Sequence, residues 1–163
     1  MNSEIMKRFF IYIFTLSCLL GCKSKKISTA AFHNYNTECL GISMDGTQTL
    51  RVWGTGRNRS DAIEQAKKKA VYDVVFVGIQ AGRGECNSYP VIDEPNARKK
   101  YEDYFDLFFS NGGAYKEYVS AKNQKISALH RFKGDGTETF GIIVIVNRSA
   151  LRQRFANDNI IIK

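Results

Sequence analysis

The hydrophobic and polar residues in the middle of the chain recur first with a period of two and then with a period of four. In TQTLRVWG (47–54), Leu50 and Val52 alternate with Arg51 and Trp53, which predicts a half-buried strand. In SDAIEQAKKKAVYDVVFVGI, alanine at every fourth position predicts a helix capped by Ser60. The apolar face of this helix comprises Ala62, Ala66, Ala70 and Val74, widened by Ile63 and Val77. Small residues on that face let the helix axis approach a sheet closely.

Turn-forming residues divide the rest of the chain. Residues 82–100 hold both prolines and several turn clusters, which indicates an irregular insertion in which Pro95 is placed to open a second helix. Two extended runs, 118–133 and 137–147, flank a glycine turn and predict a β-hairpin. The second run is apolar without alternation over 142–146, which indicates a central strand covered on both faces.

A short edge segment near 38–44 and a last helix over 149–158, capped by Ser149, complete the pattern. The order strand, helix, helix, hairpin, helix predicts an α+β domain of two layers, with helices packed mainly on one face of an antiparallel sheet. The chain of 163 residues is long enough for one such domain, which we place over residues 47–163.

The amino terminus carries the most specific signal in the sequence. A basic stretch precedes an apolar segment over residues 9–20, which is too short to span a membrane but fits the apolar part of a secretory signal. The segment ends in LLGC, which resembles the cleavage motif of bacterial lipoprotein signal peptides. We therefore predict a signal peptide over residues 1–21 and a lipid on the sulfur of Cys22. An ordinary cleaved signal and a buried helix of a cytoplasmic protein are the alternatives.

A lipid on Cys22 determines the expected location and partners. Acyl chains would hold the protein at a membrane, since each buried methylene contributes about 0.8 kcal/mol. Lys23 is not the aspartate that, by the same resemblance, retains a lipoprotein in the inner membrane. We therefore expect the outer membrane, with the domain in the periplasm and residues 22–46 as lipidated terminus and tether. Other envelope proteins are the expected partners, and a homo-oligomer is a further option.

The cysteines add a possible cross-link. Once the amino terminus is processed, Cys39 and Cys86 remain, and an even pair in an oxidising compartment invites a disulfide. Such a bridge would stabilise the fold by about 4 kcal/mol through the entropy of the unfolded chain. Two unrelated buried cysteines are the alternative. Since the sequence has no Cys-x-x-Cys motif and no Cys/His cluster, neither a metal nor another cofactor is expected.

The run RVWGTGRNRSDAIEQAKKKAVYDV resembles the opening of a family of small bacterial membrane-associated lipoproteins, which is similar to the N-terminal domain of the flagellar T-ring assembly protein. The shared pattern is a strand ending in Gly-x-Gly, here Gly54 and Gly56, followed by a helix with alanine at every fourth position. A hairpin with an apolar second strand also fits, so the resemblance covers residues 47–81 and 124–147. It implies an envelope-associated, non-catalytic domain that contacts other proteins, and it carries over no catalytic residues.

Candidate catalytic groups are scattered along the chain. The run GTGRNR lacks the third glycine of a dinucleotide-binding fingerprint, because Arg59 stands in its place. His33 and His130 lie far apart and have no motif-linked nucleophile. The acidic residues near Asp93 and Asp106 suit a solvated surface, although a glycoside-cleaving pair depends on a spatial separation that the sequence does not give.

Two groups of side chains are candidates for a contact surface. Tyr101, Tyr104 and Phe108 fall on one face of the second predicted helix, where they either pack in the core or form an exposed aromatic patch. Lys67 and Lys68 lie on the polar face of the first helix, where they either touch anionic groups or remain solvated. The formal net charge of +8 does not select a partner, and an envelope location argues against nucleic acid.

These observations favour a non-catalytic interaction or assembly module that is an accessory of a secretion, motility or surface-structure complex. The alternative is an envelope hydrolase that acts on cell-wall or glycan material. The first hypothesis predicts a contact surface and a bound partner. The second predicts a cleft with convergent carboxylates, or a histidine near a serine, threonine or cysteine.

Overall fold

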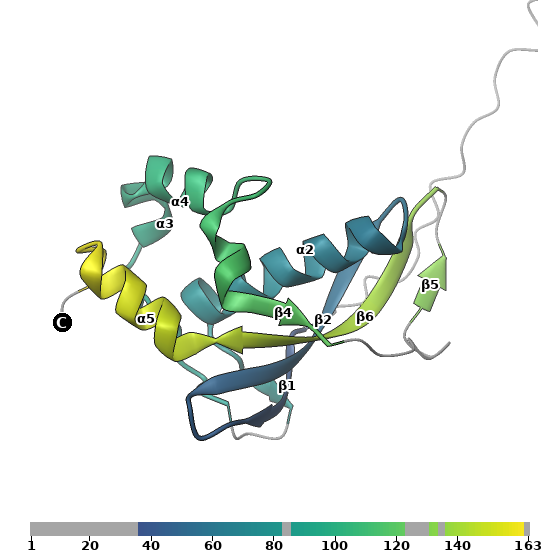
Figure 1. Ribbon diagram of the computed structural model, residues 1–163, viewed down its shortest axis with the longest axis horizontal. Coiled ribbons are helices and arrows are strands. Elements are labelled where there is room, and N and C mark those ends of the chain that lie inside the picture. The colour runs from purple at the N-terminus through teal and green to yellow at the C-terminus, as the bar shows by residue number, and fades with distance from the viewer. Residues whose placement is uncertain (1–35, 83–85, 123–130, 134–135, 162–163) are drawn as a thin grey trace, which may run out of the picture. The chain divides into compact units, whose positions relative to one another are not determined.

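A mixed β-sheet with helices on one side forms the fold in the computed structural model, which describes residues 36–82, 86–122, 131–133 and 136–161 (Figure 1). The elements in chain order are β1 (Glu38–Ile42), β2 (Thr47–Gly56), α2 (Arg59–Tyr72), the π-helix η2 (Asp73–Val77), β3 (Ala81–Gly82), α3 (Ala97–Lys100), α4 (Glu102–Phe108), the 3-10 helix η3 (Ala114–Tyr118), β4 (Val119–Ala121), β5 (Arg131–Lys133), β6 (Glu138–Asn147) and α5 (Arg148–Asn157). The predicted α+β class is confirmed.

The sheet has the strand order β3-β1-β2-β6-β4, and β5 also pairs with β6. Among the described strands, every pairing is antiparallel except that of β1 with β3, where Glu38 lies beside Ala81 in a parallel arrangement. The predicted antiparallel sheet is therefore confirmed only in part. Parallel neighbours need a long crossover, and β2, α2 and η2 together provide it.

Strand β1 lies inside the segment that the sequence analysis assigns to a tether. Its residues pair with β2 on one side, where Cys39 lies opposite Leu50, and with β3 on the other. The sheet therefore begins by Glu38, before the predicted domain boundary at residue 47, and β1 is not an edge strand. The predicted signal peptide, residues 1–21, and the lipidation site Cys22 lie outside the described residues.

The long strands β2 and β6 pair along their whole lengths, from Thr47 opposite Asn147 to Gly56 opposite Glu138. The predicted alternation of β2 is confirmed, because Leu50 and Val52 are fully buried while their neighbours are partly exposed. Strand β6 is central, as predicted, since it lies between β2 and the short strands β4 and β5.

The expectation that β6 is covered on both faces is not met. Phe140, Ile142, Val144 and Val146 are buried against the helices, whereas Ile143 and Ile145 on the other face are only partly buried. Helices α2, α3 and α4 all lie on one side of the sheet in Figure 1. One face of β6 is therefore covered and the other is only partly covered. The amino-acid composition of a strand does not distinguish this case from burial on both faces.

The hairpin around the glycine turn is confirmed at its tip, where Lys133 of β5 lies opposite Glu138 of β6. Its first arm is not one strand, however. Strand β4 pairs with the far end of β6, with Val119 opposite Val146, and residues 123–130 between β4 and β5 lie outside the described residues.

Helix α2 packs its alanine face on the sheet. Ala62, Ala66 and Ala70 have no solvent exposure, which confirms the predicted face. The N-cap is Asn58, not Ser60, because the Asn58 side chain accepts a hydrogen bond of 2.9 Å from the backbone N–H of Asp61. Only Arg57 and Asn58 thus separate the end of β2 from the start of the helix.

The second predicted helix is broken in two. It begins at Ala97 rather than at Pro95, and Tyr101, with φ of −115°, separates α3 from α4. The aromatic rings that follow fill the core between these helices and α5: the centroids of Phe105 and Phe108 lie 5.8 and 5.5 Å from that of Phe155. Edge-to-face and tilted contacts of this kind stabilise by about 1 kcal/mol each beyond area burial.

Candidate binding pocket

The wall of the candidate site is a loop that docks onto the π-helix η2. In η2 the backbone N–H of Gly78 bonds to the carbonyl of Asp73 at 2.7 Å, five residues back instead of four. The carbonyls of Val74 and Val75 are then free to accept from the N–H groups of Val91 and Ile92, each at 3.0 Å. The widened turn therefore holds the predicted irregular insertion against the core. It also turns Val77 outward, 52% exposed, so Val77 does not widen the apolar face as predicted.

A disulfide holds the start of the same loop. Cys39 of β1 and Cys86 form a disulfide bond, with their Cα atoms 5.8 Å apart and a sequence separation of 47. The predicted disulfide is therefore present, and the alternative of two unrelated buried cysteines is wrong. Because Cys86 immediately precedes the loop that begins at Asn87, the bridge ties that loop to the sheet.

Helix α5 faces the loop across a pocket. Its N-cap is Asn147, whose side chain accepts from the N–H of Ala150 at 2.9 Å, so the predicted cap at Ser149 is wrong. The Ser149 hydroxyl instead donates to the carbonyl of Asp45 at 3.1 Å and joins α5 to the β1–β2 turn. With the helix beginning at Arg148, the side chains of Arg148 and Arg152 stand one turn apart on the same face.

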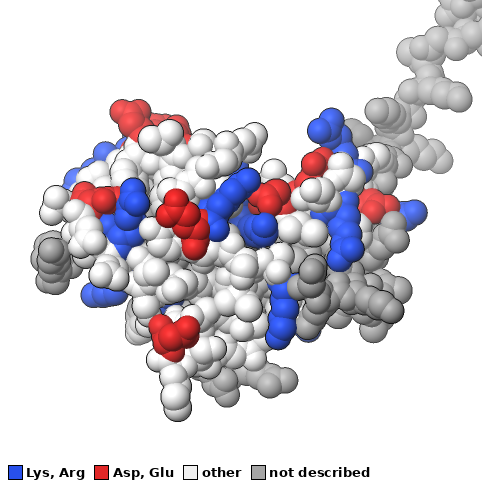
Figure 2. Space-filling model, in the orientation of Figure 1, with Lys and Arg blue, Asp and Glu red and all other residues white. Residues whose placement is uncertain are grey.

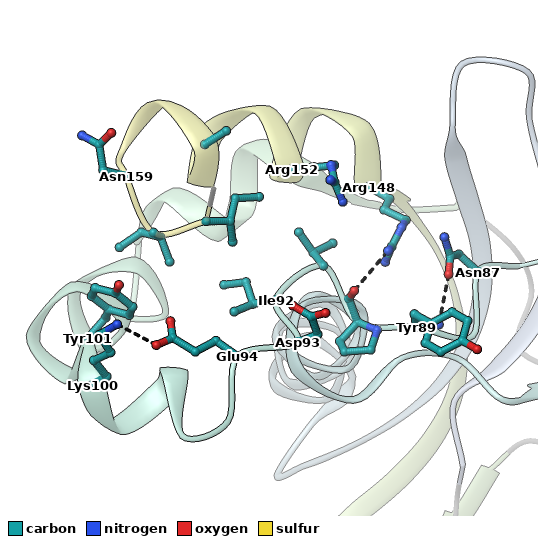
Figure 3. A pocket seen from close by; sticks show the side chains of 15 residues that line it. Asn87, Tyr89, Ile92, Asp93, Glu94, Lys100, Tyr101, Arg148, Arg152 and Asn159 are labelled. Atoms are coloured by element: carbon teal, nitrogen blue, oxygen red, sulfur yellow. Dashed lines mark hydrogen bonds and ion pairs between the residues drawn. The ribbon is translucent and has the colours of Figure 1, made fainter. Parts of the chain in front are cut away.

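The space between α5 and the loop is a pocket of about 930 Å³, which we call the arginine pocket. Its lining includes Arg148, Arg152, Asp93, Lys100, Tyr101 and the apolar residues Val91, Ile92, Ile160 and Ile161. In Figure 3 Arg148 and Arg152 extend from α5 toward the loop, and Glu94, Lys100 and Tyr101 lie at the other end. A concave site with an apolar lining and a few charged groups is the usual form of a ligand site.

The charges in the arginine pocket are unevenly paired. Lys100 and Glu94 form an ion pair with 2.6 Å between Nζ and Oε1. Among the described residues, neither Arg148 nor Arg152 has a carboxylate within 4.0 Å. Burial, and secondly the nearby charge of Arg152, lowers the pKa of the Arg148 guanidinium. The Arg148 end of the pocket therefore carries a half-buried positive charge that no described carboxylate compensates. Binding of an anion there would be favourable.

The five predicted contact residues do not form one surface. Phe108 is 3% exposed and packs in the core, so its assignment to a contact surface is wrong. Tyr101 lines the arginine pocket. Lys67 is paired with Glu64 at 3.0 Å, and Lys68 lies over the ring of Tyr115 at 5.5 Å, beside a different hollow.

Tyr104, the remaining predicted contact residue, joins α4 to the end of α5. Its hydroxyl donates to Asp158 at 2.5 Å, and Arg154 donates to the same carboxylate oxygen at 2.5 Å. Burial and then the bond to Asp158 raise the pKa of Tyr104 to about 12. This half-buried side chain has a structural partner and is not part of an open aromatic patch.

The charged side chains on one face of the described residues are of both signs. On the face shown in Figure 2, basic and acidic side chains are interspersed. The polar face of α2 contributes to this pattern, because Glu64 is also bonded to Lys116 at 3.1 Å and Lys69 to Asp73 at 2.7 Å. Some of the basic side chains that give the sequence its positive net charge are thus neutralised by neighbouring acidic side chains.

Sequence reasoning missed Arg148 and Arg152. The pattern RSALR contains the spacing of four that places two side chains on one helix face. Starting the helix at Ser149 left Arg148 outside it. The position of the loop carrying Val91 and Asp93, which completes the pocket, has no local sequence signal.

Comparison of the chain with models of protein families, with characterised proteins and with solved structures finds no match. Within the described residues, no helix is both long and apolar enough to cross a membrane. Within the same residues, no three His, Cys, Asp or Glu side chains gather as metal ligands would. His33 and His130 lie outside the described residues.

Proposed function

We propose that the protein is a lipid-anchored binding module of the bacterial envelope, which holds partner proteins through the arginine pocket and performs no catalysis. The observation that carries the proposal is the pair Arg148 and Arg152, which open into a lined pocket without a carboxylate partner among the described residues. The envelope location rests on the amino-terminal sequence that ends in Cys22.

The architecture around the pocket supports a binding role. Both walls are held in place before any partner arrives, one by the Cys39–Cys86 bridge and the bonds to η2, the other by the cap at Asn147. A preorganised site loses less conformational entropy on binding than a mobile one. The lipid would restrict the module to the membrane surface, where an accessory of a secretion, motility or surface-structure complex acts.

Site-specific photo-crosslinking in the producing bacterium tests this function. Tyr89 at the rim of the arginine pocket and Leu107 on α4 are both 75% exposed, so a photoreactive phenylalanine at either position is equally accessible. We expect a discrete adduct with an envelope protein from position 89 and none from position 107. Equal labelling from both positions, or none from position 89, would contradict the proposal.

The lipid anchor and the alternative function as an envelope hydrolase are tested separately. The variant Cys22→Ser is expected to leave the membrane fraction and to lose the adduct from position 89. If it still fractionates with membranes, the lipid anchor is excluded. Release of soluble fragments from purified cell wall by the full-length protein would replace the binding module with an envelope hydrolase.

A further inference from the structure

The guanidinium of Arg148 has unused hydrogen-bonding capacity. Its Nη1 donates to the carbonyl of Val74 at 3.4 Å and its Nη2 to that of Pro90 at 3.3 Å. Both bonds are long, and a guanidinium has five N–H donors. The carbonyls orient the group from the η2 and loop side, and no described carboxylate neutralises it.

Arg152 adds a second guanidinium on the same helix face. Like charges four residues apart on a helix are mutually unfavourable, and here one of them is also half-buried. The nearby charge of Arg152 contributes to the lowered pKa of Arg148. An anion between the two side chains would remove this repulsion and provide acceptors for both. Planar carboxylates match the fork of a guanidinium in two parallel hydrogen bonds.

The charge count of the pocket favours a monoanion. Lys100 and Glu94 neutralise each other, which leaves Arg148 and Arg152 against Asp93. This end of the pocket therefore has a single excess positive charge, which matches one carboxylate better than a phosphate dianion or an anionic membrane surface. The Asp93 carboxylate is in addition an acceptor for N–H groups that accompany the anion.

Apolar side chains line the pocket next to its cationic end. Val91 and Ile92 directly follow Pro90, the carbonyl partner of Arg148, and both are buried, as is Ile160 across the pocket. A ligand therefore needs an apolar group within a few bonds of its carboxylate and a polar backbone beside it. The last residue of a polypeptide has this arrangement, because its carboxylate, side chain and N–H diverge from one Cα atom.

We propose that the arginine pocket binds the free carboxyl terminus of a partner polypeptide whose last side chain is apolar. Arg148 and Arg152 bind the carboxylate, Val91, Ile92 and Ile160 bind the side chain, and Asp93 accepts from the peptide N–H groups. This assignment rests on the proposed binding function and specifies what the same pocket recognises.

Calorimetric titration of the lipidated mature protein in detergent tests the assignment. The probes are the peptide N-acetyl-Gly-Ala-Leu with a free carboxylate, the same peptide as its C-terminal amide, an amidated peptide with an internal glutamate, and inorganic phosphate. We expect the free acid to bind at least about tenfold more tightly than each of the other three. The reason is that only the free acid offers a terminal carboxylate for charged hydrogen bonds with the two arginines. Equal binding of the acid and its amide would overturn the proposal, as would tighter binding of phosphate or of the internal glutamate.

Variants separate the arginine pocket from general charge. Arg148→Gln and Arg152→Gln are each expected to weaken binding of the acid about tenfold or more, and Arg148→Lys by less than Arg148→Gln because it keeps the charge and loses the fork. Lys122→Gln removes one exposed positive charge outside the pocket and should leave affinity unchanged. Since Arg152 is exposed, its variant remains informative even if Arg148→Gln does not fold.

The two proposals fail in different ways. Adducts from position 89 together with equal affinity for acid and amide would keep the binding module and exclude carboxyl-terminus recognition. If the acid binds through the arginines but no adduct forms from position 89, recognition of a free carboxyl terminus by the arginine pocket is kept. The envelope partner is then excluded.

Discussion

Gly54 of β2 lies in backbone contact with Ala62 of α2: a Cβ atom added at Gly54 would stand 1.9 Å from the Ala62 carbonyl oxygen and 2.8 Å from the backbone N of Ala66. The missing side chain is therefore what allows the alanine face of α2 to lie on the sheet. This contact gives a physical reason for the Gly-x-Gly strand end followed by alanine at every fourth position.

Replacing Gly54 by alanine should lower the free energy of unfolding by about 3 kcal/mol, because the clash is with backbone that has no rotamer to change. Urea unfolding measures the loss. Gly112→Ala is the matched control: Gly112 has φ of +91° but nothing within 4 Å of an added Cβ. It should cost only about 1 kcal/mol through backbone strain. If the two variants are equally stable, close packing at Gly54 is not the constraint.

Replacing Gln48 should stabilise the protein. Gln48 is fully buried on the helix side of β2, and neither its Oε1 nor its Nε2 atom has a hydrogen-bond partner among the described residues. Gln48→Met keeps the length of the side chain and removes the unpaired amide, so we expect a gain of about 1–2 kcal/mol in urea unfolding. The exposed residue Gln65 provides the comparison, and Gln65→Met should change little. A loss of stability in Gln48→Met would mean that the amide is satisfied in solution.

The Tyr104–Asp158 bond should make stability depend on pH in acid. Burial on its own would raise the pKa of Asp158, but the hydrogen bonds from Tyr104 and Arg154 outweigh burial and the pKa lies below its usual value. A folded pKa below the unfolded value of about 3.9 means that the contact stabilises above that pH and is lost as the pH falls through the folded pKa.

Asp158→Asn should therefore cost about 1–2 kcal/mol at pH 7 and progressively less below pH about 4. Thermal unfolding followed at several pH values measures the difference from the wild type. Asp106→Asn removes a more exposed acid, whose side chain is 61% accessible, and should change stability by less than about 0.5 kcal/mol at any pH. A difference for Asp158→Asn that does not shrink in acid would exclude the ionised carboxylate as its source.

Removing the disulfide should destabilise the fold and loosen the pocket loop together. The double variant Cys39→Ala, Cys86→Ala should lose about 4 kcal/mol, because the unfolded chain regains the entropy of a long closed loop. Reducing agent should bring the wild type to the same unfolding midpoint and leave the variant unchanged. The non-reduced, lipidated mature protein should titrate no free thiol, and a count of two would exclude the bridge.

The sequence by itself determined the elements whose signal is local. Alternation over β2, alanine spacing over α2 and a glycine turn before β6 each reflect one face of one element against the core, so these elements and the α+β class could be predicted. The same logic failed where two outcomes share one pattern. The apolar residues in β6 predicted a strand covered on both faces, and serines near two helix starts predicted caps. The caps are instead Asn58, two residues beyond the end of β2, and Asn147, the last residue of β6.

Only the tertiary structure decided the features that depend on residues distant in sequence. The parallel pairing of β1 with β3 needs a crossover to return beside a strand formed earlier, and the arginine pocket needs a loop held on η2 to face α5. Neither arrangement changes the local periodicity of the segments that form it. The side chains of Arg148 and Arg152 are ordinary helix-surface residues in the sequence, and they become a candidate anion site because packing half-buries Arg148 and brings no carboxylate of the described residues to neutralise either one.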